Sequence, residues 1–270
     1  MKSQIIQKIK SMTKSEHILL ADSGDKAIML AMQAAKAINP KEKFLIPDQG
    51  GWFSYQKYPK RLNFNVVEIK TDYGVIDINS LKQNIDGSSA FVYSNPAGYF
   101  AEQPCPQIYF ACKDTCLVIK DISGSIGNEK ISSIADADFL VCSFGEWKPV
   151  NLDYGGFIAA KTDRLFKEID ASQAVFRGEY ISELANLLDN LKPRLDRMYN
   201  RAMKVKEDLK RFNIIHPDSR GINVVVKFSG DIEKAEIISY CNQNKLEFTL
   251  CPRYIRVNEK AISIEIKRID

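Results

Sequence analysis

Hydrophobic residues in the first third of the chain alternate between helical and strand-like spacing. Residues 1–14 place apolar side chains at helical intervals, and residues 27–38, rich in Ala and Met, end just before a proline. Residues 44–46 and 66–69 are short apolar runs of strand length, and residues 78–85 return to a helical pattern. The pattern therefore predicts strands alternating with helices, as in α/β proteins.

Three further apolar runs of strand length lie at residues 90–93, 117–120 and 139–143. Each leads directly into polar or glycine-containing residues. Continuous apolar strands between helices are typical of a parallel sheet covered on both faces, and such sheets bind ligands at the carboxyl ends of their strands. We therefore expect a ligand site at these three strand ends. Residues 156–160 fit an antiparallel return strand.

The C-terminal third has a different pattern. Residues 179–212 are helical and strongly charged, residues 224–228 form a predicted strand, and residues 232–242 a helix. A hairpin is predicted from residues 254–257 and 261–266 around a polar turn. This order of elements indicates a small α+β domain at the end of the chain.

The change of pattern suggests a division of the chain into three parts. They are a large α/β domain (1–175), a connecting helical segment (176–220) that Pro193 breaks or kinks, and a small α+β domain (221–270).

Charge and hydropathy exclude some classes of partner. The chain has 270 residues and a net charge of +4, and its Lys and Arg residues are scattered rather than gathered in a stripe, so nucleic acid is not expected. No stretch approaches the ~20 consecutive apolar residues that cross a bilayer, and no apolar run follows the basic N-terminus. We expect a cytoplasmic protein without membrane or nucleic-acid partners.

Six cysteines are expected to be free, buried thiols in an intracellular chain of this length. Cys112 and Cys116 are four positions apart, but this is not the usual zinc spacing, and neither His17 nor His216 lies near a cysteine in sequence. No metal site is therefore predicted.

Four segments resemble one family in their order and local context. The sequence SFGEWK at 143–148 is followed by DYGGF at 153–157, and it resembles the lysine segment of pyridoxal-phosphate (PLP)-dependent sugar aminotransferases of the DegT/StrS type. The strand and loop at 118–127 resemble the family's segment that carries the carboxylate partner of the pyridine nitrogen. The turn at 23–27 is similar to the family's phosphate-binding helix start.

The resemblance implies a fold-type I architecture, in which a mostly parallel central sheet has helices on both faces and a small α+β domain follows. It implies PLP as the cofactor, Lys148 as the Schiff-base lysine and Asp121 as the partner of the pyridine nitrogen. Other candidate cofactor-binding residues are Ser23, Gly24, Asp25, Trp52, Asn95, Ser123 and Ser143. Taken singly, each has an ordinary structural interpretation as a cap, turn, core or surface residue.

The C-terminal segment CPRYIRVN at 251–258 resembles the small-domain strand of amino-acid-type fold-type I aminotransferases. In those proteins an arginine binds the substrate carboxylate, so Arg256 is the candidate substrate-binding residue; an exposed strand arginine is the alternative. The implied reaction moves an amino group between an amino acid and a carbonyl acceptor, and the implied assembly is a homodimer.

Two departures keep other functions open. Asp25 stands where the family usually has Thr, and a carboxylate beside a phosphate is repulsive. The chain is also shorter than usual members of the family. The alternatives are PLP-dependent elimination or sulfur transfer with a cysteine as acceptor, and a catalytically altered or inactive binding or regulatory protein that kept the fold.

Overall fold

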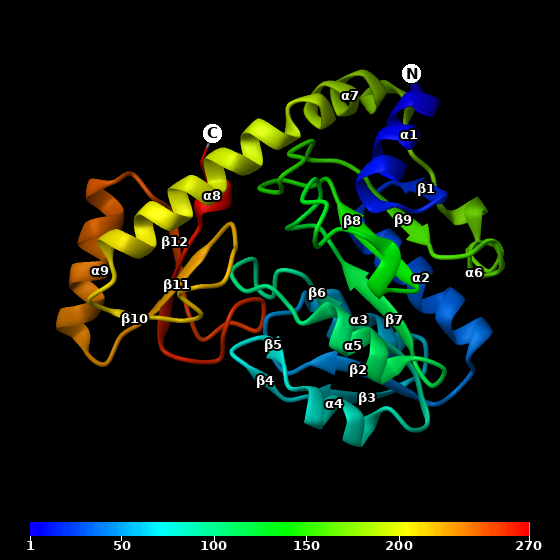
Figure 1. Cartoon of the computed structure of the whole chain (residues 1–270), viewed down its shortest axis with the longest axis horizontal. Coiled ribbons are helices and arrows are strands. Elements are labelled where there is room, and N and C mark those ends of the chain that lie inside the picture. The colour runs from blue at the N-terminus through cyan, green and yellow to red at the C-terminus, as the bar shows by residue number, and fades with distance from the viewer. Residues whose placement is uncertain (270) are drawn as a thin grey trace.

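The computed structural model describes residues 1–269 and is built around two sheets (Figure 1). The larger sheet has seven strands; β9 is antiparallel to both of its neighbours, and the other paired strands are parallel. In spatial order they are β1 (His17–Ala21), β9 (Gly156–Ala160), β8 (Phe139–Ser143), β7 (Leu117–Asp121), β6 (Ser88–Ser94), β2 (Lys43–Pro47) and β3 (Asn65–Ile69).

Helices cover both faces of this sheet and bury two apolar cores. On one face lie α1 (Lys2–Thr13), α4 (Ile78–Asn84) and α5 (Cys105–Cys112). On the other lie α2 (Gly24–Ile38), α3 (Phe53–Arg61) and α6 (Asp163–Lys167). The strands between the two layers are almost entirely buried, which explains why their sequences are continuously apolar instead of alternating.

Helix α2 begins just after β1 and packs against the central sheet. Its alanine-rich sequence favours a helix, and its small side chains allow close packing against β8 and β9. The hydroxyl of Ser23 accepts a hydrogen bond of 3.1 Å from the Lys26 backbone N–H and so caps the helix. The amino end of α2 therefore lies directly beyond the carboxyl end of β1.

A second, antiparallel sheet lies at the other end of the molecule, and α8 extends toward it along one side (Figure 1). Its strands, in spatial order, are β10 (Asn213–Ile214), β11 (Val224–Lys227), β13 (Ala261–Ile264) and β12 (Phe248–Leu250). The helices of this half are α7 (Ile181–Asp189), α8 (Leu191–Asp208) and α9 (Asp231–Gln243). The remaining elements are the hairpin β4 (Thr71–Asp72) and β5 (Val75–Ile76), and the 3₁₀ turns η1 (Ile134–Asp136), η2 (Ala171–Gln173), η3 (Gly178–Tyr180) and η4 (Ile266–Arg268).

The predicted fold class is confirmed: the central sheet is mostly parallel with helices on both faces, and a small sheet follows. The helical break lies at Asn190, whereas Pro193 sits in the first turn of α8, where its missing N–H is tolerated. Strand β1 and helices α3 and α5 were not predicted.

The predicted hairpin was wrong in its first strand. Residues 254–257 form turns, and the partners of β13 are β11 and β12. The backbone N–H of Arg256 donates to the carbonyl of Arg253, which closes a tight turn. The apolar residues Tyr254, Ile255 and Val257 resemble a short strand in sequence, but Arg256 is buried beside Val257 and is held there by an ion pair with Glu265.

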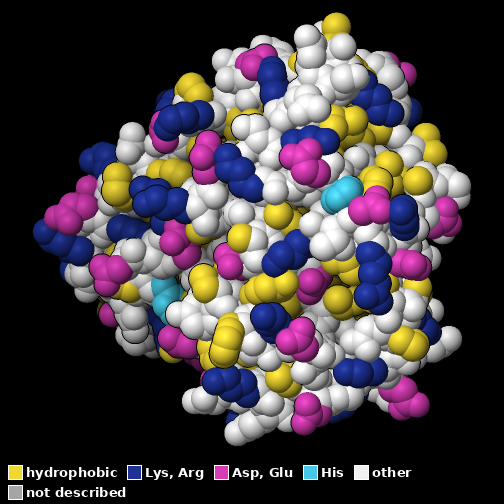
Figure 2. Space-filling view, turned by 45° about the vertical axis from the view of Figure 1, so that its right-hand side comes forward, with side chains coloured by type: hydrophobic (Ala, Val, Ile, Leu, Met, Phe, Trp, Pro, Cys, Tyr) yellow, Lys and Arg dark blue, Asp and Glu magenta, His cyan; other side chains and the backbone are white. Residues whose placement is uncertain are grey.

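Residues 1–269 contain no helix that is both long and apolar enough to cross a membrane. Acidic and basic side chains are interspersed over the face shown in Figure 2, in keeping with the scattered charge of the sequence.

Candidate active site

The carboxyl ends of the central strands open into a cavity of about 340 Å³. Five segments line it: the start of α2, the loop before α3, and the loops after β6, β7 and β8. Parallel strands end on the same edge of a sheet, which is why residues far apart in sequence meet here. The candidate residues that line the cavity are Ser23, Gly24, Asp25, Trp52, Asp121, Ser123, Ser143 and Lys148.

Asp121 ends β7 and is only 6% exposed. One carboxylate oxygen accepts a hydrogen bond of 2.8 Å from the Tyr55 hydroxyl, and the other accepts one of 2.8 Å from the Ser123 backbone N–H. Burial raises the pKa of Asp121 above its ordinary value although both hydrogen bonds favour the charged form. The carboxylate is thus well positioned, and no described cation forms an ion pair with it within 4 Å.

Lys148 lies in the loop after β8 and is 9% exposed. Its ammonium group sits 5.1 Å from the ring centre of Trp52 and 5.0 Å from that of Tyr99. Burial alone would lower its pKa, but the Tyr99 hydroxyl and the Asp121 carboxylate outweigh burial, so the pKa lies above the ordinary value for lysine. The amine is therefore protonated at neutral pH.

Backbone and hydroxyl groups gather at the amino end of α2. A Cβ atom added to Gly24 would lie 2.4 Å from the Cβ of Ser143, so only glycine allows this approach of helix and strand. The Ser123 hydroxyl accepts from the Ser143 backbone N–H at 2.8 Å, and the Ser143 hydroxyl accepts from the Gly145 N–H at 3.1 Å. Such a combination of a helix N-terminus and hydroxyl groups suits an anion.

Asp25 is tied to the aromatic wall of the cavity. The Trp52 indole N–H donates to its Oδ1 at 2.9 Å, and the Ser54 hydroxyl donates to the same oxygen at 2.6 Å. These two donors offset part of the carboxylate charge and fix the plane of the indole. The unusual residue at position 25 therefore has a definite structural task.

Two candidate residues do not line this cavity. Asn95 is fully buried; its amide nitrogen points at the Cys105 sulfur (3.1 Å) and its amide oxygen accepts from the Gln103 N–H (3.0 Å). Arg256 is 2% exposed and forms a two-point contact with Glu265. Neither side chain is free to reach a ligand in the cavity without giving up these contacts.

Sequence reasoning missed two tyrosines of the site. Tyr55 is fully buried on α3 and donates to Asp121, and Tyr99 faces Lys148 from a loop with a positive φ of 70°. Tyr99 lies four residues after Asn95, which the sequence does single out, so its proximity to a site could have been suspected. Nothing in the sequence separates Tyr55 from the other tyrosines.

The cysteines are free thiols and all six are buried, as expected. Cys142, next to Ser143, is in strand β8, and burial raises the pKa of its thiol well above the ordinary value. A sulfur acceptor must be accessible and readily ionised, and this thiol is neither. Within residues 1–269 no group of three or more metal-ligating side chains is present.

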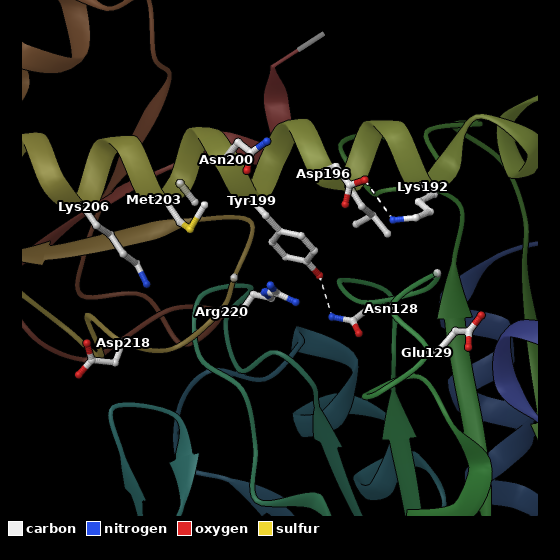
Figure 3. Close-up of a pocket in the computed structure, with 14 residues that line it drawn as sticks. Asn128, Glu129, Lys192, Asp196, Tyr199, Asn200, Met203, Lys206, Asp218 and Arg220 are labelled. Carbon is white, nitrogen blue, oxygen red and sulfur yellow. Dashed lines mark hydrogen bonds and ion pairs between the residues drawn. The ribbon is translucent and has the colours of Figure 1, made fainter.

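A larger cleft of about 690 Å³ lies between α8 and the loops at residues 127–129 and 218–221 (Figure 3). Tyr199 points into it and accepts a hydrogen bond of 3.3 Å from Asn128, while Lys192 pairs with Asp196 along the helix. Acidic and basic residues alternate around this cleft. It contains none of the candidate residues, so size alone does not identify the site.

Comparisons with known proteins agree on the architecture. A sequence model of the MJ1341 family C-terminal domain matches residues 192–270, which is less than half of the chain. A search of the curated proteins finds no match to the sequence.

Solved structures with this fold include three proteins that differ in chemistry. Spr1654 of Streptococcus pneumoniae, designated a sugar aminotransferase and solved in its PMP form, has a TM-score of 0.76 at 12% identity over 98% of this chain and 84% of its own. Serine palmitoyltransferase of S. paucimobilis, solved with PLP and myriocin, has a TM-score of 0.74 at 13% identity over 98% of this chain and 71% of its own. Cysteine desulfurase of Thermococcus onnurineus NA1 has a TM-score of 0.71 at 10% identity over 97% of this chain and 78% of its own.

At these low identities the likeness concerns the fold and does not extend to the reaction. The neighbours are PLP-dependent enzymes, and the candidate residues of this chain gather at the strand ends where α/β folds bind ligands. The chain therefore has the fold of the fold-type I PLP-dependent transferases.

Proposed function

We propose that this protein is a PLP-dependent aminotransferase that moves an amino group between a small amino acid donor and a carbonyl acceptor. The observation that carries the proposal is the meeting of Asp121, Lys148 and the amino end of α2 around one cavity. These are the three groups that such a cofactor needs: a carboxylate for its ring nitrogen, an amine for its aldehyde, and donors for its phosphate. Solved neighbours of this fold carry PLP or PMP.

The donor set fits the cofactor in charge as well as in position. Asp121 has two hydrogen-bond donors, yet burial keeps its pKa raised, so a cationic partner would stabilise its charged form. A protonated pyridine nitrogen is such a partner. PLP, when bound, supplies an electron sink, and the role of Asp121 is to keep the proton on that nitrogen. Tyr55 holds the carboxylate in place.

Lys148 would attach to the cofactor aldehyde and afterwards carry a proton at the substrate carbon. Both tasks need a neutral amine, whereas the pKa of Lys148 is raised in the free site. Tyr99 and Asp121 cause that rise, so pairing Asp121 with the cofactor ring would remove part of it. Loading of the cofactor would thus lower the proton affinity of the lysine that reacts with it.

The phosphate would bind at the amino end of α2, where Ser23, Gly24, Ser123 and Ser143 converge. Asp25 would not compete for this position with its Oδ1, which already accepts from Trp52 and Ser54. Instead it would hold the indole as a wall against which the cofactor ring can stack.

We further propose that the enzyme works in the cytoplasm as a homodimer, with a large domain (1–175), a helical connection (176–220) and a small domain (221–270). These assignments rest on the family resemblance and on the change of sequence pattern. The amino donor and acceptor are small molecules in this proposal.

The test is the absorption spectrum of purified protein with added PLP, before and after borohydride. We expect a visible band that borohydride abolishes, and peptide mass mapping should then find the reduced cofactor on Lys148. Lys148→Ala should lack the band, while Lys192→Ala, which changes an exposed lysine on α8, should keep it. If the wild type shows no band, the fold serves a binding or regulatory role instead.

A further inference from the structure

The backbone of Tyr99 is held by residues next to the small sheet, although Tyr99 lines the cavity at the end of the central sheet. Its carbonyl accepts hydrogen bonds from the N–H groups of Ile222 (2.8 Å) and Asn223 (3.0 Å), which lead directly into β11. Its φ of 70° is uncommon for a residue with a side chain and persists only where the surrounding structure fixes it. Contacts from both halves of the molecule therefore set the position of Tyr99.

The half-buried ring of Tyr99 is packed as closely as its backbone is held. A Cβ atom added to Gly124 would lie 2.6 Å from the Cδ1 of Tyr99 and 3.3 Å from the Cδ of Pro96. The ring therefore fills the space that a side chain at position 124 would need. Gly124 lies in the loop after β7, the strand that ends in Asp121. Because the ring is packed against this loop, its hydroxyl has a fixed place in the cavity wall.

This ring faces the candidate Schiff-base lysine. The ammonium group of Lys148 lies 5.0 Å from the ring centre of Tyr99, and the Tyr99 hydroxyl is its hydrogen-bond partner. The ammonium group of Lys267 and the guanidinium of Arg256 lie 5.0 Å and 5.2 Å from the same ring centre. An ammonium group is attracted both to the face of a tyrosine ring and to its hydroxyl oxygen. Tyr99 can therefore hold the end of the Lys148 side chain at the cavity.

A second fixed ring limits the lysine from another segment. The Lys148 ammonium group lies 5.1 Å from the ring centre of Trp52, and Asp25 accepts a hydrogen bond from the indole N–H of that residue. A lysine side chain has four flexible methylene groups, and fixing its end costs conformational entropy. Contact with two rings that are already held reduces the number of places the amine can take. The position of the amine is thus set by the protein itself.

We propose that Tyr99 is a positioning residue for Lys148, whose amine it holds at the place where the cofactor aldehyde must meet it. The proposal rests on the proposed aminotransferase function and deepens it, because it adds a residue that the family resemblance does not supply. The Tyr99 hydroxyl also raises the pKa of Lys148. Removal of the hydroxyl should therefore favour the neutral amine and at the same time leave it free to move.

Other charged groups also surround this amine, and they stay unchanged when only the Tyr99 hydroxyl is removed. Those that line the cavity or interact with Lys148 are Asp25, Asp121, Glu146, Arg256 and Lys267. Asp121 raises the pKa of Lys148, whereas Arg256 lowers it. A change in the pKa of Lys148 in Tyr99→Phe therefore measures what the hydroxyl contributes.

The first experiment uses the protein without PLP. Short pulses of reductive methylation across a pH series, read by peptide mass mapping, give the pH midpoint at which each lysine becomes reactive. Tyr99→Phe keeps the ring and should lower the Lys148 midpoint by at least about one pH unit. Tyr109→Phe is the matched control, because the Tyr109 hydroxyl accepts from Lys161 at 2.8 Å and its ring centre lies 4.0 Å from that amine, outside the cavity. This control should leave the Lys148 midpoint unchanged.

A second variant displaces the ring and keeps the hydroxyl. Gly124→Ala places a Cβ atom against the Tyr99 ring, so it should lower the Lys148 midpoint in the same direction as Tyr99→Phe. Gly230→Ala is its control, because no heavy atom lies within 4 Å of a Cβ atom added there, and it should match wild type. Circular dichroism shows whether each variant is folded, and Tyr99→Phe decides alone if Gly124→Ala is not.

The second measurement is the rate at which added PLP produces its visible band. Above the Lys148 midpoint the amine is neutral in every variant, and Tyr99→Phe should form the band at least about tenfold more slowly than wild type, because the amine is no longer held in place. Two outcomes would overturn the inference: a folded Tyr99→Phe protein with the wild-type midpoint, or one that forms the band at the wild-type rate. A wild type that forms no band, together with a lowered midpoint in Tyr99→Phe, would refute the aminotransferase proposal and leave the role of Tyr99 at Lys148 standing.

Discussion

Asp121 and Glu265 are both buried carboxylates, yet their pKa values move in opposite directions. Burial raises the pKa of Asp121, whose hydrogen-bond donors are the Tyr55 hydroxyl and the Ser123 backbone N–H. Burial also opposes the charge of Glu265, but Arg256 and Lys267 outweigh it and hold the pKa far below the ordinary value. Depth of burial is similar; the cations around each group differ.

The two carboxylates differ in whether groups of the chain balance their charge. Glu265 is surrounded by partners of the same chain, so its charge belongs to the architecture of the small sheet. Asp121 is also oriented by two hydrogen bonds, but it forms no ion pair within 4 Å, and the nearby cation Lys148 only partly offsets its burial. The same contrast distinguishes Arg256, which is fully engaged, from Lys267, which is not.

The largest expected effect comes from Glu265→Gln. It leaves Arg256 buried without its counter-charge, so the free energy of unfolding should fall by about 3–5 kcal/mol in urea titrations. Glu247→Gln is the matched control, because Glu247 pairs with Arg268 at the surface, and it should change stability by less than about 1 kcal/mol. Equal losses of stability in the two variants would mean that the buried Glu265 contributes no more than a surface carboxylate.

The next effect concerns activity rather than stability. Asp121→Asn keeps the shape of the side chain; its amide oxygen can still accept from the Ser123 N–H, and its NH2 group can donate to the Tyr55 hydroxyl oxygen if that hydroxyl turns away. The free energy of unfolding should therefore change by no more than about 1 kcal/mol. The rate of amino transfer should fall at least ~100-fold, because the ring proton would lose its counter-charge. Single-turnover absorbance and urea unfolding measure the two quantities. A loss of stability as large as that of Glu265→Gln would mean that Asp121 is structural.

A pH series sharpens the comparison at Lys267. Its pKa is about 7 in the folded protein and ~10.4 in the unfolded chain, so between these values the unfolded state binds more protons. Stability contributed by this group therefore rises with pH through that window, by about 2 kcal/mol from pH 7 to pH 9. The difference in unfolding free energy between wild type and Lys267→Met isolates the effect. A difference that stays constant across the window contradicts it.

The smallest effect is expected from Tyr55→Phe. It removes one hydrogen bond from a buried carboxylate oxygen, so unfolding free energy should fall by about 1–2 kcal/mol. Tyr240→Phe is the control, since Tyr240 donates to the exposed Asp208 and its loss can be replaced by water. Urea unfolding of both variants measures the two losses of stability. A larger loss for Tyr240→Phe than for Tyr55→Phe would mean that the burial of Asp121 does not strengthen its hydrogen bond.

The sequence predicted that Asp121 and Ser143 lie near each other because parallel strands end at the same edge of a sheet. Once apolar runs are assigned to neighbouring strands, the residues that follow them, Asp121 and Ser143, must share an edge of the sheet. Tyr55 and Tyr99 could not be predicted because a single sequence does not show which ring packs beside a given carboxylate or lysine. Arg256 was placed on a strand because its neighbours Tyr254, Ile255 and Val257 are apolar, and such a run does not reveal a buried ion pair.

The pairing of β1 with β9 has a consequence for synthesis of the chain. In the larger sheet β1 contacts β9, and the bridge from Ser23 to Gly155 continues that contact into the site. A nascent chain therefore cannot seat the amino end of α2 until residues 156–160 have left the ribosome.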